Sequence, residues 1–334
     1  MTMVSFGDLA QSFVLKSQTA RLKGDLGRIT QELGSSRLAD VGSAVSGDFS
    51  RLSALARART TTEGYQSAAR EVAAQADASQ TVIATLSEHM QALIPPLLSA
   101  SPLMTAEQVA FTGAEARMRF SDVVASLNTS IGGRALFAGR AIQGPAVADA
   151  ETILTALRSE LVGTTSANDA MMRISAWFDN AAGYSTIAYL GDAALDNAAV
   201  SPTDRVWLGA TADDPAMRAT LLGLAAAALI ADAGNPLPLS EKGAFTRHAA
   251  EMLTAGHDRL LDLGARIGIS QSRIEAAQSR NAADLLSLEL AQGALVQADP
   301  YRLATELEAV QTNLETVYAI TARLSRLSLT DFLR

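Results

Sequence analysis

The chain has 334 residues, enough for two or three domains, and 48% of them are hydrophobic although only 5% are aromatic. Alanine and leucine dominate, which favours closely packed helices, and the absence of cysteine excludes disulfides and thiolate metal sites. The net charge is −8, and residues 141–240 hold 11 acidic and 4 basic side chains, so no basic face for nucleic acid is evident.

The first predicted helix lies near the N-terminus and carries a regular apolar stripe. Its spacings alternate between four and three residues, the pattern of a helix that packs along another helix. The stripe consists of Leu15, Thr19, Leu22, Leu26, Ile29 and Leu33. The helix is expected to end near Gly34. We expect no cleaved signal peptide, because the first ten residues lack a basic start and Asp8 interrupts their short apolar stretch.

Two further helices are predicted in the first half of the chain. Heptad-spaced apolar residues indicate one long helix over about 49–94, which Pro95-Pro96 is expected to end or kink. Another helix is predicted over 105–131, where Gly132-Gly133 stops it. Residues 136–139, Leu-Phe-Ala-Gly, are expected to form a short strand or a tight turn.

Residues 141–239 carry a different pattern and are predicted to form a small acidic α/β insertion. The predicted elements are helices at 149–161 and 168–179, strands at 186–190 and 205–208, and a helix that begins at Pro215. The apolar run at 221–231 is too short to span a bilayer and indicates a buried helix. Glu151, Glu160 and the other acidic residues are interpreted as a solvated face.

The C-terminal third is predicted to contain two helices. Residues 241–297 lack proline and indicate one helix of about 85 Å. Within its apolar heptad line, Asn281 is either buried, where it fixes the pairing register, or partly exposed. Asp299 is expected to cap the last helix, with Pro300 in its first turn.

The last helix repeats the apolar stripe of the first one. Its positions are Leu303, Leu307, Val310, Leu314, Val317, Thr321 and Leu324. The matching lengths predict that the first and last helices pair. Because two helices form a thin core, we expect neighbouring subunits to complete it, which indicates an assembly protein.

Residue types that carry chemistry do not form a convincing site in this sequence. No two of His89, His248 and His257 have the i, i+4 spacing of a helical metal pair, so they are interpreted as surface or satisfied histidines. Asp213-Asp214 before Pro215 is interpreted as a helix start rather than a catalytic dyad. We therefore expect no enzyme, catalytic residue, cofactor or metal, with an enzyme within 141–239 as an alternative.

The nested order of these elements resembles the bacterial flagellin and hook-associated protein 3 family. The resemblance is carried by Leu136–Gly139, Leu263–Arg266, Arg273–Glu275, Asn281 and Ala298–Tyr301. The ending Leu327–Leu333 is similar to that of hook–filament junction proteins, whereas Leu333-Arg334 also fits a flagellin tail. At 46–50 the chain has Ser-Gly-Asp-Phe-Ser where the family usually has an Asp-Asp-Pro or Asp-Asp-Ala segment.

The resemblance implies a mostly α, flagellin-like nested coiled-coil rod with three domains. Residues 1–46 would pair with 299–334 in an inner tube domain, 47–140 and 240–298 would form the rod, and 141–239 would form the outer insertion. The implied assembly interface consists of Leu15, Leu22, Leu26, Ile29, Leu33, Leu303, Leu307, Val310, Leu314, Val317, Leu324, Leu327, Leu329 and Phe332.

The function implied by the resemblance is that of an extracellular structural subunit of the bacterial flagellum, exported through the type III apparatus without signal cleavage. The favoured role is the junction between hook and filament. Its implied partners are copies of itself in a ring, another hook-associated protein, flagellin and an export chaperone on the C-terminal helix, with neither nucleic acid nor membrane. Flagellin itself, or a coiled-coil subunit of another secretion appendage, is the alternative.

Overall fold

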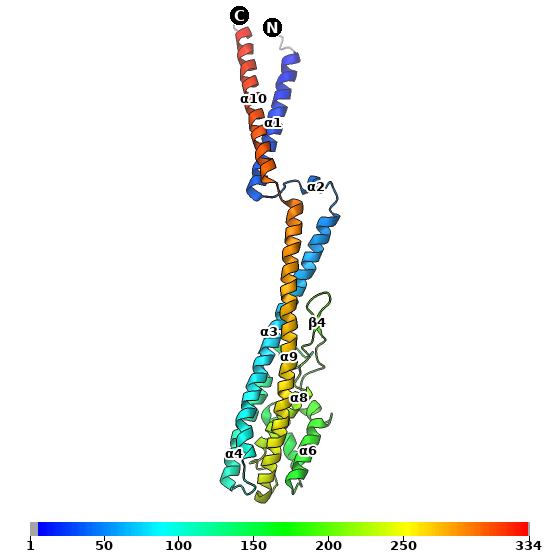
Figure 1. The fold of residues 1–334 in the computed structure, drawn as a ribbon, viewed down its shortest axis with the longest axis vertical. Helices are drawn as coiled ribbons and strands as arrows, with labels where there is room; N and C mark the ends of the chain where they lie inside the picture. The colour runs from blue at the N-terminus through cyan, green and yellow to red at the C-terminus, as the bar shows by residue number, and fades with distance from the viewer. Residues whose placement is uncertain (1–5, 333–334) are drawn as a thin grey trace. The chain divides into compact units, whose positions relative to one another are not determined.

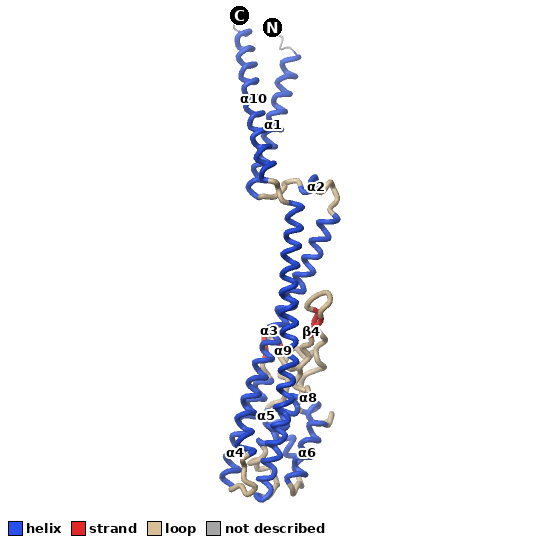
Figure 2. Tube along the Cα trace, viewed as in Figure 1, coloured by secondary structure: helices blue, strands red, loops and turns tan. Residues whose placement is uncertain are grey.

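The computed structural model describes residues 6–332, with side chains at all of them except 6–9, 11–12, 43–44 and 324–332. The described chain is mostly helical, and its strands form two short antiparallel hairpins (Figure 2). The expected mostly α fold with a small strand-containing segment is confirmed. No helix within the described range is long and apolar enough to cross a membrane.

The elements follow one another as shown in Figure 1. They are α1 (Phe6–Ser35), α2 (Val41–Ala44), α3 (Ser50–Leu98), α4 (Ala106–Leu127), β1 (Ser130–Ile131), β2 (Arg134–Ala135), α5 (Ala150–Leu161), α6 (Ala167–Asp179), α7 (Tyr184–Ile187), β3 (Ala198–Ala199), β4 (Arg205–Val206), α8 (Pro215–Ala228), α9 (Leu239–Val296) and α10 (Pro300–Phe332).

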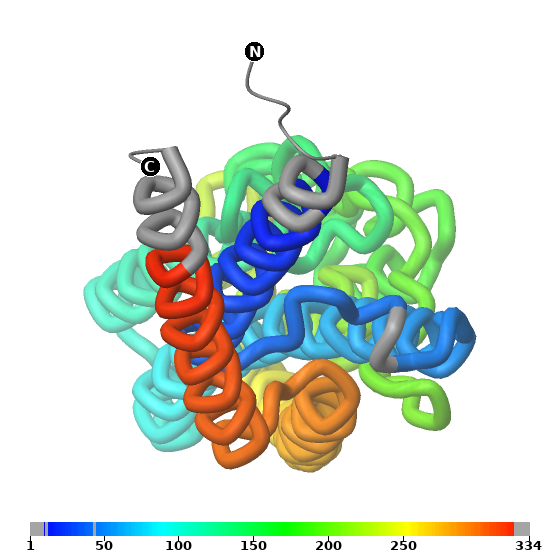
Figure 3. Tube along the Cα trace, turned by 90° about the horizontal axis from the view of Figure 1, so that it is seen from above, coloured from blue at the N-terminus to red at the C-terminus, as the bar shows by residue number. Residues whose placement is uncertain are grey.

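The chain forms two compact units. The first contains Met1–Thr61 and Ala283–Arg334, and the second contains Thr62–Ala282, so α3 and α9 contribute to both. Within the first unit, α1 and α10 lie side by side (Figures 1 and 3). The three-domain division expected from the sequence stays a prediction.

The proline pair near the end of α3 does not stop the helix, which continues to Leu98. Leu93 and Leu97 on either side of the prolines are buried at 1% and 0% exposure, so packing against the core holds this last turn. The Ser99 amide also donates to the Pro95 carbonyl at 3.0 Å and extends the helical pattern beyond the prolines. Burial of the flanking leucines offsets the cost of proline here.

A glycine turn follows α4, which ends at Leu127, four residues earlier than expected. Strands β1 and β2 pair through Ser130 with Ala135 and Ile131 with Arg134. Gly132 and Gly133 form the turn between them with φ of 58° and 79°, which glycine adopts without steric cost.

The Leu-Phe-Ala-Gly segment at 136–139 forms a turn rather than a strand. Phe137 is fully buried, and its carbonyl accepts from the Ala212 amide at 2.9 Å. Gly139 has φ of 62°, and a Cβ there would lie 2.4 Å from the Ala193 carbonyl oxygen. The segment therefore ties the β1–β2 hairpin to the insertion through backbone contacts.

The prediction of a strand at 186–190 is wrong. This region begins with the short helix α7, whose Tyr184 is fully buried beside Trp177 and Phe178. The Tyr184 hydroxyl donates to the Ala212 carbonyl at 2.8 Å. Aromatic packing thus decides the local conformation. At 205–208 the predicted strand is shorter than expected, because only β4 pairs with β3.

Helix α8 is buried at nearly every residue, and continuously from Thr220 to Ala228, as the apolar run at 221–231 predicted. Its contact with α9 depends on glycine. A Cβ at Gly223 would lie 2.6 Å from the Leu253 Cα, and one at Gly256 would lie 2.7 Å from the Ala219 carbonyl oxygen. The backbones of α8 and α9 therefore approach too closely for any side chain at these two positions.

Candidate assembly interface

The seam between α1 and α10 has a small apolar centre close to the loops that join these helices to α2 and α9. Ile29, Ala298 and Leu303 are buried there, and Leu38, Leu307 and Val310 pack against them in part. Two backbone hydrogen bonds hold the loops together, from the Leu38 amide to the Val296 carbonyl at 2.9 Å and from the Ala298 amide to the Ser36 carbonyl at 3.2 Å. These contacts therefore fix α1 and α10 to each other at the loop end of the seam.

The predicted stripe positions differ in burial within the single chain. Ile29 and Leu303 are each 1% exposed, and Leu314 and Val317 are 8% and 9% exposed. Five other stripe positions are half-buried: Leu15, Leu22, Leu26, Leu307 and Val310. Leu33 is exposed. Leu324, Leu327, Leu329 and Phe332 lie outside the residues whose side chains are described.

Large apolar side chains outside the predicted set are also exposed on these two helices. They are Phe13 and Val14 on α1 and Tyr301, Tyr318 and Ile320 on α10, with Phe13 and Tyr301 at 73% and 86% exposure. Two helices shield only one side of each other, so the remaining apolar surface faces solvent. These residues were not predicted from the sequence, because they fall outside the main heptad positions.

A buried carboxylate was also missed in this seam. Glu32 is 2% exposed and accepts hydrogen bonds from the Ala39 amide at 3.0 Å and from Arg28 at 3.1 Å. Arg28 also lies 3.5 Å from Glu306 of α10. The i, i+4 spacing of Arg28 and Glu32 was the available signal. These contacts fix the end of α1 against the following loop and against α10.

The acidic residues of the insertion are not simply a solvated face. Asp232, which follows α8, has a side chain only 2% exposed and accepts from Arg158 at 2.7 Å and Arg117 at 3.3 Å. Both arginines also contact Glu151. The hydrogen bonds from Arg158, with help from the Gly234 amide, hold the pKa of Asp232 below its ordinary value. This cluster joins α4, α5 and the end of α8.

His257 is satisfied as predicted, because its Nε2 lies 2.9 Å from the Ser87 hydroxyl. The other two histidines differ from the prediction, since the Nδ1 atoms of His89 and His248 are buried with no hydrogen-bond partner among the described residues. Within the same range, no group of three potential metal ligands occurs. Asp214 accepts from the Ala216 amide at 2.9 Å and caps α8, as predicted.

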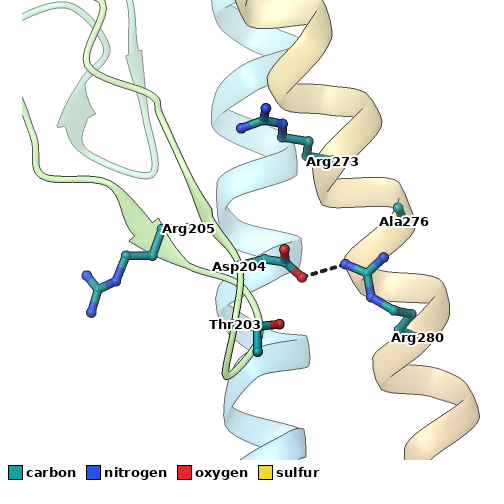
Figure 4. Close-up of a pocket in the computed structure, with 6 residues that line it drawn as sticks. All are labelled: Thr203, Asp204, Arg205, Arg273, Ala276 and Arg280. Atoms are coloured by element: carbon teal, nitrogen blue, oxygen red, sulfur yellow. Dashed lines mark hydrogen bonds and ion pairs between the residues drawn. The ribbon is translucent and has the colours of Figure 1, made fainter.

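The β3–β4 hairpin is bound to one face of α9. Asn281, 2% exposed, donates to the Val200 carbonyl at 2.9 Å, so the buried alternative is correct, but its partner is the hairpin. The Ser270 hydroxyl donates to the Trp207 carbonyl at 2.9 Å, and Arg280 contacts Asp204 at 2.6 Å (Figure 4). The Ser201 hydroxyl and Arg280 together lower the pKa of Asp204.

Comparison with known proteins agrees with the helical architecture. Residues 252–333, which include most of α9 and all of α10, match the family model of the bacterial flagellin C-terminal helical region. A structure from Vibrio parahaemolyticus, reported as a candidate flagellar hook-associated protein, has a TM-score of 0.51 and 14% identity. The resemblance to the flagellin and hook-associated family is confirmed.

The structural match covers 73% of this chain and 95% of the Vibrio chain, so it concerns the fold of nearly the whole relative. No curated protein matches the chain. The flagellin-family match and the shared fold support a structural subunit of the bacterial flagellum.

Proposed function

We propose that the chain is the junction subunit that connects the flagellar hook to the filament, and that it assembles through α1 and α10. The observation that carries this proposal is the seam itself. A single copy leaves apolar side chains exposed on both terminal helices, including Phe13 and Tyr301. Neighbouring copies in a tube supply the missing cover. Burying one such aromatic side chain contributes about 1.5–3 kcal/mol.

The choice of the junction over the filament rests on two likenesses. The matched fold is that of a candidate hook-associated protein, and the ending Leu327–Leu333 resembles that of junction proteins. In this role the subunit forms a ring with copies of itself, between another hook-associated protein and flagellin. It is exported without signal cleavage to the cell exterior, and a chaperone covers α10 before export.

The proposed arrangement assigns a location in the assembly to each part of the chain. Residues 1–46 and 299–334 form the inner tube layer, and 47–140 with 240–298 form the layer around it. The acidic segment 141–239 faces the medium. Charge supports this assignment, because residues 141–240 carry 11 of the 35 acidic side chains but only 4 of the 27 basic ones.

Flagellin is the second candidate, because the matching family model describes the flagellin C-terminal region. Antibody labelling of isolated flagella separates the two roles. A narrow band at the hook end supports the junction, whereas label along the whole filament supports flagellin. Polymerisation of the purified chain provides an independent control, since flagellin grows into long filaments and a junction subunit stops at short rings. A coiled-coil subunit of another appendage predicts no flagellar label at all.

A further inference from the structure

A line of arginines runs along α9 at intervals of seven residues. Arg259, Arg266, Arg273 and Arg280 each precede a buried residue of the helix, namely Leu260, Ile267, Ile274 and Asn281. Seven residues are about two helical turns, so the arginines share one side of α9, about 10.5 Å apart along its axis. This side borders the β3–β4 hairpin (Figure 4).

Two of these arginines have partners in the insertion, and the one between them does not. Arg266 lies over the Trp207 ring at 5.0 Å and 3.5 Å from Asp214. Arg280 lies 2.6 Å from Asp204. Arg273 has no acidic side chain within ion-pair distance among the described residues. Its guanidinium therefore has hydrogen-bond donors available for another group.

Arg273 lines a pocket of about 470 Å³ between α9 and the hairpin. The lining residues are Thr203, Asp204, Arg205, Arg273, Ala276 and Arg280. Three arginines and one aspartate give this pocket a net charge of +2, although the insertion as a whole is acidic. In Figure 4 the Arg273 side chain extends from α9 towards the hairpin, and Arg205 extends away from α9 on the hairpin's other side.

The walls of the pocket are held in place on both sides of Arg273. Ser270 bonds the Trp207 carbonyl on one side, and Asn281 bonds the Val200 carbonyl on the other, each at 2.9 Å. The turn between β3 and β4 is further fixed by the Ser201 hydroxyl, which donates to Asp204 at 2.8 Å. Because Arg280 neutralises Asp204, this carboxylate opposes an incoming anion only weakly. The pocket is thus formed before any ligand binds.

We propose that this pocket is an oxyanion site, in which the guanidinium of Arg273 binds a carboxylate or phosphate group. A guanidinium donates two parallel hydrogen bonds to either group. The positive charge of Arg205 adds long-range attraction, whereas the charge of Arg280 is balanced by Asp204. The oxyanion comes either from a small free anion or from an acidic side chain of a second copy of the chain. The site lies within the second unit and does not depend on the proposed flagellar role.

Calorimetric titration of the full chain at low ionic strength tests the site. The probes are inorganic phosphate and citrate, with sodium chloride at equal ionic strength as the measure of screening. We expect saturable binding of at least one probe. Arg273→Gln is expected to weaken it by about tenfold or more, since a charge-assisted bidentate contact is lost. Arg259→Gln is the matched control, since it removes the same charge from the same line outside the pocket, and it is expected to leave the affinity unchanged.

Sedimentation equilibrium of the same proteins tests whether the oxyanion comes from an acidic side chain of a second copy. Association that Arg273→Gln abolishes and Arg259→Gln preserves assigns the oxyanion to an acidic side chain of another copy. The proposal is overturned if the wild type shows no probe binding beyond the sodium chloride effect and no such association. Equal losses in the two variants would also overturn it, because a general loss of positive charge would then explain them. Unchanged urea unfolding of both variants establishes that the fold is intact.

Discussion

Asp232 is the carboxylate whose removal is expected to cost most in the second unit. Its side chain is 2% exposed and is contacted by Arg158 and Arg117 from two different helices. Asp232→Asn leaves these arginines without their buried counter-charge. We expect the free energy of unfolding of the second unit to fall by about 2–4 kcal/mol, less than for a fully enclosed pair because both arginines are partly exposed. Urea unfolding measures this change.

Asp196→Asn is the control for that substitution. Asp196 also pairs with an arginine, Arg140 at 3.0 Å, but its side chain is 87% exposed. Exposed pairs contribute about 0–1 kcal/mol, so this variant is expected to unfold almost as the wild type does. Equal losses in the two variants would mean that burial of Asp232 does not set the strength of its cluster.

The same carboxylate predicts a pH dependence of stability. Arg158 lowers the pKa of Asp232 in the folded state. A lowered folded pKa means that the contribution is complete above the unfolded value, about 3.9, and is lost as pH falls through the folded value. The difference in unfolding free energy between wild type and Asp232→Asn is therefore expected to stay constant from about pH 5 to 7 and to shrink below about pH 4. A difference that shrinks already near pH 6 would point to a histidine instead.

At the scale of elements, the contact between α8 and α9 depends on Gly256. Replacing a helical glycine by alanine usually stabilises a protein by up to about 1 kcal/mol. At Gly256 the added Cβ would lie 2.7 Å from the Ala219 carbonyl oxygen, so we expect Gly256→Ala to destabilise the second unit by about 1–3 kcal/mol. Gly268→Ala in the same helix meets nothing within 4 Å and is expected to be neutral or stabilising. Thermal unfolding compares the two, and the opposite order would refute close backbone packing here.

The elements that sequence analysis located best are those with local, repeated signals. The helix predicted at 241–297 is α9, Leu239–Val296, because heptad spacing and the lack of proline are readable along the chain itself. Contacts over long sequence separations were not predictable in this way. Asp232 meets Arg117 across 115 residues and Asp204 meets Arg280 across 76, and neither pairing leaves a local pattern. The short helix α7 was missed in part for the same reason, since the Tyr184 hydroxyl is held by the Ala212 carbonyl 28 residues further along the chain.

For the whole molecule, the proposed assembly predicts that one charge in the seam is enough to stop incorporation. Leu314 is 8% exposed on α10, and Leu314→Asp places an unpaired carboxylate among apolar side chains. We expect loss of motility and of filament attachment, with unchanged urea unfolding of the second unit. Asn313→Asp introduces the same charge at a neighbouring exposed position of the helix. A strain that carries this control substitution is expected to swim normally. A motile Leu314→Asp strain would exclude this seam from the interface.

The two units are also expected to differ in how strongly they resist local opening. Nearly every residue of α8 is buried, whereas α1 and α10 share a small buried centre around Ile29 and Leu303. Amide hydrogens open with a free energy that follows such packing. In dilute solution we therefore expect the amides of 13–28 and 307–323 to exchange far faster than those of α8, and to become protected on assembly. Mass spectrometry of the free and assembled chain measures both states. Equal protection of the terminal helices and α8 in the free chain would contradict assembly-driven ordering, because the seam would then already be complete in a single copy.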